Sequence, residues 1–132
     1  MSFFFRFLDF QTCHWTSPVI DLLYFINANA TMDHVKNPEI IIEEYYSGLN
    51  DTFTALGASH LCPSKLHLYQ QCDKRCKFGV ITGLVVRNGI LGDNASADAV
   101  EKLLSDDKIH FGELYKKESR EMLTIFHERG WL

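Results

Sequence analysis

Residues 7–25 read FLDFQTCHWTSPVIDLLYF, and this stretch decides the fold class. The apolar run over residues 3–10 predicts a β-strand that has the carboxylate of Asp9 near its end. Ser17-Pro18 predicts the start of a helix, because serine caps the first turn and proline fits the first helical position. The aliphatic and aromatic residues that follow extend this helix over residues 19–27. We therefore expect a short N-terminal β element followed by a buried helix.

Longer helices are predicted further along the chain. Apolar residues recur at three- and four-residue steps, and we expect Leu66 and Leu114 among them to face the core. Ser64 is a start signal, and Gly57 and Gly130 are stop signals. The expected helices cover residues 38–56, 65–88 and 113–129, with a loop over 27–33 and a short acidic helix over 96–104. Gly79 and Gly83 lie inside one of these helices at a spacing that permits another helix to approach closely. The predicted fold class is mainly α with a short N-terminal β element.

The composition is that of an ordinary globular domain. The chain has 132 residues, of which 46% are hydrophobic and 23% are charged, and its formal net charge is -4. A nucleic-acid interface needs a basic stripe, which is missing from the sequence. No stretch approaches the roughly 20 apolar residues of a membrane span. We expect a cytoplasmic protein that binds neither nucleic acid nor membrane.

Two carboxylates stand in apolar surroundings. Asp9 either binds a cation such as Mg²⁺ or simply ends its strand and caps the following turn. Asp21 lies in a helix that is apolar almost all round, so we expect it to have little access to water. It either anchors a neighbouring loop through hydrogen bonds or makes a local contact within its own helix. Residue types alone leave both pairs of alternatives open.

Cysteines and histidines give weaker signals. Cys72 and Cys76 share one helix face, which favours two core residues over half of a metal site. The six histidines have no typical metal-binding spacing.

The stretch over residues 7–25 resembles the signature of the ecdysteroid kinase-like (CHK kinase-like) family, which reads as Asp-Phe-Gln, a short polar and aromatic segment, Ser-Pro and an Asp-Leu-rich helix. Weaker likeness continues in family order at residues 43–46, 77–84 and 128–132. The resemblance implies that residues 1–132 are a partial kinase-like domain. This part would be the C-terminal lobe of a protein-kinase-like α/β fold, without the N-lobe and the catalytic loop.

The resemblance also implies roles for individual residues. Asp9 corresponds to the aspartate that positions Mg²⁺ on the phosphates of ATP, and Asp21 to the helix aspartate that anchors the catalytic loop. Gln11 stands where kinases often have glycine. In related kinases the later helices form the wall of the acceptor site. Candidates for such a wall are Trp15, Tyr45, Tyr46, Tyr69 and Phe78.

Several parts of a kinase have no counterpart in this sequence. It contains no Gly-rich phosphate loop before Asp9, no strand lysine and no His-Gly-Asp segment with a catalytic aspartate. We expect the C-terminal fragment of an ATP- and Mg²⁺-dependent phosphotransferase that acts on a small hydroxylated molecule. Alone it would be inactive and would not bind ATP and Mg²⁺ tightly. The alternatives are a non-catalytic helical module that binds a partner through the surface left uncovered by the missing lobe, or an incomplete gene prediction.

Overall fold

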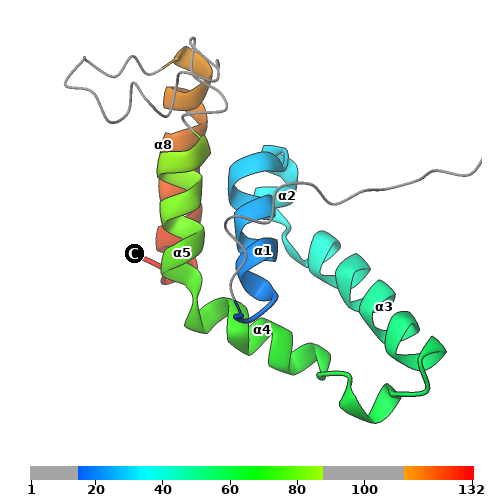
Figure 1. The fold of residues 1–132 in the computed structure, drawn as a ribbon. Coiled ribbons are helices and arrows are strands. Elements are labelled where there is room, and N and C mark those ends of the chain that lie inside the picture. The colour runs from blue at the N-terminus through cyan, green and yellow to red at the C-terminus, as the bar shows by residue number, and fades with distance from the viewer. Residues whose placement is uncertain (1–14, 88–111) are drawn as a thin grey trace, which may run out of the picture.

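The computed structural model describes residues 15–87 and 112–132, and Figure 1 shows that this part is built from helices. The order is α1 (Val19–Tyr24), η1 (Phe25–Asn29), α2 (Met32–Lys36), α3 (Glu39–Ala55), η2 (Ser59–Leu61), α4 (Lys65–Lys74), α5 (Cys76–Ile81), η3 (Thr82–Val86) and α8 (Glu113–Glu128). The described ranges contain no strand. The mainly α class is therefore confirmed. The predicted β element over residues 3–10, Asp9 and the predicted helix over 96–104 lie outside the described residues.

Helix α1 begins where Ser17-Pro18 predicts. The backbone N–H of Ile20 donates to the Ser17 carbonyl at 3.1 Å, so the backbone of Ser17, and not its side chain, closes the first turn. One face of α1 is buried, with Val19 and Leu23 at 0% and 2% exposure. These side chains share a core with Leu68 and Cys72 of α4.

The loop predicted over residues 27–33 is wrong at both ends. The chain continues from α1 as the π-helical segment η1 to Asn29, and α2 starts at Met32. Thr31 starts α2, because its carbonyl accepts from the N–H of Val35 at 3.0 Å and its hydroxyl pairs with His34 Nδ1 at 3.0 Å. Val35 is fully buried against α8, and this tertiary contact stabilises a helix too short to persist alone.

The single helix predicted over residues 65–88 is broken at Arg75. Ser64 caps α4 as predicted, since its hydroxyl accepts from the N–H of His67 at 3.2 Å. Arg75 then leaves helical geometry, with φ -113° and ψ 15°, and the chain changes direction between α4 and α5 (Figure 1). With this break, both α4 and α5 contact α1.

Gly79 and Gly83 confirm the predicted close approach of helices. A Cβ atom on Gly79 would lie 2.9 Å from Asn27 Nδ2 and 3.2 Å from the Trp131 ring. A Cβ atom on Gly83 would overlap Met122 Cε. The absence of side chains at both positions thus lets α5 and η3 contact η1 and α8 (Figure 1).

Arg87 joins three parts of the fold from a buried position. Its side chain is 4% exposed, and its Nε donates to Glu118 Oε2 on α8 at 2.8 Å. Its Nη1 donates to the carbonyls of Asn27 and Ala30 at 3.2 and 2.9 Å. These carbonyls lie at the end of η1, where the helix no longer supplies N–H partners. Arg87 therefore ties the end of η1 to α8.

The last helix follows the prediction closely. It ends before Gly130, whose φ of 69° is the left-handed conformation that favours glycine. Met122 and Phe126 are fully buried, whereas Leu114, which was predicted to face the core, is 53% exposed.

Candidate functional site

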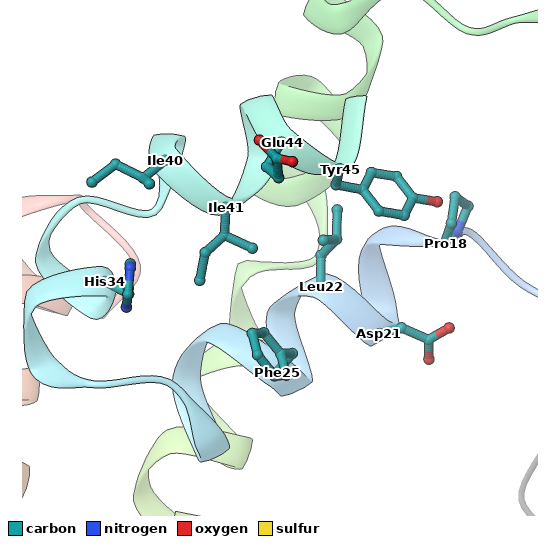
Figure 2. Close-up of a pocket in the computed structure, with 9 residues that line it drawn as sticks. All are labelled: Pro18, Asp21, Leu22, Phe25, His34, Ile40, Ile41, Glu44 and Tyr45. Carbon is teal, nitrogen blue, oxygen red and sulfur yellow. The ribbon is translucent and has the colours of Figure 1, made fainter. Parts of the chain in front are cut away.

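A groove of about 610 Å³ lies between α1, α2 and α3 (Figure 2). It is lined by Pro18, Asp21, Leu22, Phe25, His34, Ile40, Ile41, Glu44 and Tyr45. Its volume is in the range of sites for drug-sized ligands. The groove is therefore the candidate site of the described chain.

The centre of the groove is apolar and its ends are polar. Figure 2 shows Leu22 and Phe25 of the α1–η1 segment facing Ile41 of α3. Asp21 and Tyr45 lie at one end beside Pro18, and His34 lies at the opposite end. Such a surface suits an elongated ligand with an apolar body and polar groups at its ends.

Asp21 is exposed, so the expectation of little access to water is wrong. The reason is that, among the described residues, one side of α1 is packed and the other is open: Val19, Leu22 and Leu23 are buried, while Tyr24 and the next residue, Phe25 of η1, are 40% and 52% exposed. The apolar sequence of α1 therefore does not mean that the helix is surrounded by protein. The catalytic loop that Asp21 would anchor has no counterpart in this sequence, so the anchoring role stays a prediction.

Tyr45 is the predicted wall residue that the structure brings to the groove. It is partly buried against the core that α1 and α4 share. Burial, together with the nearby Asp21 carboxylate, raises the pKa of the Tyr45 phenol above its usual value. Tyr45 therefore keeps its proton at neutral pH and can donate a hydrogen bond to a ligand.

The other predicted wall residues do not line the groove. Tyr69 donates from its hydroxyl to Glu43 Oε1 at 3.2 Å, and Lys65 forms an ion pair with the same carboxylate. The Lys65 ammonium also stands over the Tyr46 ring, 5.6 Å from its centre. Tyr46 and Tyr69 therefore belong to a contact between α3 and α4. Phe78 packs against the core, and Trp15 is fully exposed.

The described residues do not make a magnesium site by themselves. No group of three or more His, Cys, Asp or Glu side chains converges within residues 15–87 and 112–132. Cys72 is 5% exposed, which agrees with its predicted role as a core residue. Burial raises the pKa of its thiol to about 11, so the thiolate form that binds metals is disfavoured. Asp9, the predicted metal ligand, lies outside the described residues.

Within residues 15–87 and 112–132, no helix has the length and apolar character that crossing a bilayer requires.

Comparison with known proteins bears on the segment that builds the groove. Residues 5–58 match the model of the ecdysteroid kinase-like family. The match confirms the resemblance over this segment, which is less than half of the chain. It covers Asp9, Asp21 and every residue that lines the groove. No curated protein and no solved structure matches the chain significantly.

More than half of the residues that line the groove were not identified from the sequence. Sequence reasoning singled out Asp21 and Tyr45, but not Phe25, His34, Ile41 or Glu44. A signal for Ile41 and for its neighbour Ile40 was present in the run Glu39-Ile40-Ile41-Ile42-Glu43-Glu44, where three consecutive isoleucines exceed what one core face needs. Only Ile42 is buried in the core, at 4% exposure, and its neighbours Ile40 and Ile41 are left to line the groove.

Proposed function

We propose that this chain is the C-terminal part of an ATP- and Mg²⁺-dependent phosphotransferase that phosphorylates a hydroxyl group of an apolar small molecule, such as a steroid. The observation that carries the proposal is the family match over residues 5–58, because that segment contains the Asp-Phe-Gln triplet and also builds the groove. We further propose that the protein acts in the cytoplasm.

In this proposal the chain has two tasks. The groove holds the acceptor through its apolar centre, while Asp9 is the Mg²⁺ ligand that the family resemblance implies. Phosphoryl transfer depends mainly on positioning and electrostatic stabilisation of the transferred group. The 132-residue sequence contains no Gly-rich loop, strand lysine or His-Gly-Asp segment to provide these. We therefore propose that the chain alone does not turn over substrate.

The test is a phosphotransfer assay with γ-labelled ATP, Mg²⁺ and a polyhydroxylated steroid. The purified chain should give no more labelled steroid than its Asp9→Ala variant. Addition of a separate polypeptide that carries the Gly-rich loop, strand lysine and His-Gly-Asp segment of a family member should give turnover that Asp9→Ala abolishes. Turnover by the chain alone that is lost in Asp9→Ala would contradict the proposed inactivity.

A second candidate function is a non-catalytic module that binds a protein partner. It is favoured by the exposure of apolar side chains at the groove, where Phe25 is 52% and Ile40 is 56% exposed. The complementation arm of the assay separates the two functions. If the added polypeptide binds the chain but no turnover follows, the binding module is the better description.

A further inference from the structure

We propose that the groove between α1, α2 and α3 selects an organic cation with an apolar skeleton, so that the preferred ligand is a protonated amine. This inference rests on the proposed function for its biological meaning, since the acceptor would then be a hydroxylated molecule that also carries a protonated amine. The binding step itself can be measured without nucleotide or turnover.

Acidic side chains outnumber basic ones among the residues that line the groove. Asp21 and Glu44 contribute carboxylates, and no lysine or arginine is among the nine lining residues. The lining histidine, His34, already uses Nδ1 in its hydrogen bond with Thr31. The groove therefore attracts a cation and repels an anion such as a carboxylate or sulfate.

The two groove carboxylates also have no ion-pair partner within residues 15–87 and 112–132. Other acids near helix contacts differ in this respect. Glu118 pairs with Arg87, Glu121 with Lys36, and Glu43 with Lys65. Since no described lysine, arginine or histidine forms an ion pair with Asp21 or Glu44, both carboxylates can pair with a ligand cation without breaking an ion pair of the described chain.

The apolar centre excludes a small, fully hydrated cation as the preferred ligand. Leu22 is 6% exposed, and it lies with Phe25 and Ile41 between the polar ends of the groove (Figure 2). Burial of an apolar ligand surface over these side chains supplies affinity that a metal ion cannot obtain. The aromatic rings of Phe25 and Tyr45 add faces on which an ammonium group binds favourably.

A neutral ligand of the same shape should bind less well. It would reduce the hydration of Asp21 and Glu44 at the groove without offering a compensating charge. Exposed ion pairs are weak, so two of them correspond to a preference between about twofold and thirtyfold for the cation, and about fivefold to tenfold is the middle of that range.

The experiment compares an aminosteroid with the hydroxysteroid of the same skeleton, in which a hydroxyl replaces the amine. Both are titrated into the ¹⁵N-labelled chain at pH 7 without nucleotide. We expect the aminosteroid to bind about fivefold to tenfold more tightly, with the largest shifts at Leu22, Phe25 and Ile41. The preference should decrease at high salt, which screens exposed charges.

Two variants assign the preference to the groove. The double variant Asp21→Asn and Glu44→Gln should bind both steroids equally. Glu43→Gln removes a carboxylate that Lys65 and Tyr69 already hold, and it should leave the preference unchanged. Equal affinities in the unmodified chain, a preference that persists in the double variant, or failure of both steroids to bind would overturn the proposal. None of these results depends on phosphotransfer, so they leave the test of the proposed function separate.

Discussion

Arg87→Met is expected to lower the free energy of unfolding of the chain by about 3 kcal/mol, because it removes one member of a buried ion pair. The substitution leaves Glu118, whose side chain is 16% exposed, without its cation. It also removes the donor to the carbonyls of Asn27 and Ala30 at the end of η1. Urea denaturation followed by circular dichroism measures the effect as a lower midpoint.

Lys36→Met is the matched control for Arg87→Met. Lys36 also pairs with a glutamate of α8, Glu121, but both side chains of that pair are more than one-third exposed. An exposed pair is screened by water, so the midpoint should stay within experimental error. The double variant Arg87→Met and Glu118→Met should recover part of the loss, since it leaves no uncompensated charge. Equal effects of Arg87→Met and Lys36→Met would contradict the structure around η1.

Alanine substitutions at two glycines should change stability in opposite directions. Gly83→Ala places a methyl group against Met122 and 3.1 Å from Phe126 Cζ, and both of these side chains are fully buried. Overpacking of this kind costs about 1–3 kcal/mol. Gly48→Ala in α3 meets nothing within 4 Å and should stabilise the chain by up to about 1 kcal/mol through helix propensity.

Thermal unfolding of the two alanine variants measures both the expected loss of stability in Gly83→Ala and the expected gain in Gly48→Ala. If Gly83→Ala raised the melting temperature as much as Gly48→Ala does, α8 could not lie against η3 as described.

Local signals in the sequence predicted the helix ends well. Ser17-Pro18, Ser64, Gly57 and Gly130 all mark helix ends in the structure, because capping and left-handed glycine depend on only a few neighbouring residues. The spacing of Gly79 and Gly83 likewise predicted a close helix contact. These features could be read without knowledge of the tertiary fold.

Features that depend on tertiary packing were not predictable in the same way. The break at Arg75 follows a helix-compatible sequence, and it is visible only in the structure, where both α4 and α5 contact α1. The short helix α2 depends on the burial of Val35 against α8. Leu66 was predicted to face the core but is 67% exposed, while Leu68 on the neighbouring face is buried.

The residues of the candidate site were also only partly predictable from the sequence. The sequence indicates functional roles for Asp21 and Tyr45, and the structure brings both to one end of the groove. The exposure of Asp21 was not foreseen, because an apolar helix sequence does not reveal that one of its faces is left uncovered. His34 and Glu44 line the groove because of how α2 and α3 are arranged, which the sequence does not reveal.

We propose that Asp9, in the segment that matches the family model, is a metal ligand for a nucleotide. Mn²⁺ is a paramagnetic substitute for Mg²⁺, and millimolar Mn²⁺–ATP added to the ¹⁵N-labelled chain tests this claim directly. We predict that the amide signals of Phe10 and Gln11 broaden, that Asp9→Asn removes the broadening, and that Asp51→Asn on the exposed side of α3 does not. No broadening in the unmodified chain, or equal broadening in the Asp9→Asn variant, would contradict the assignment of Asp9.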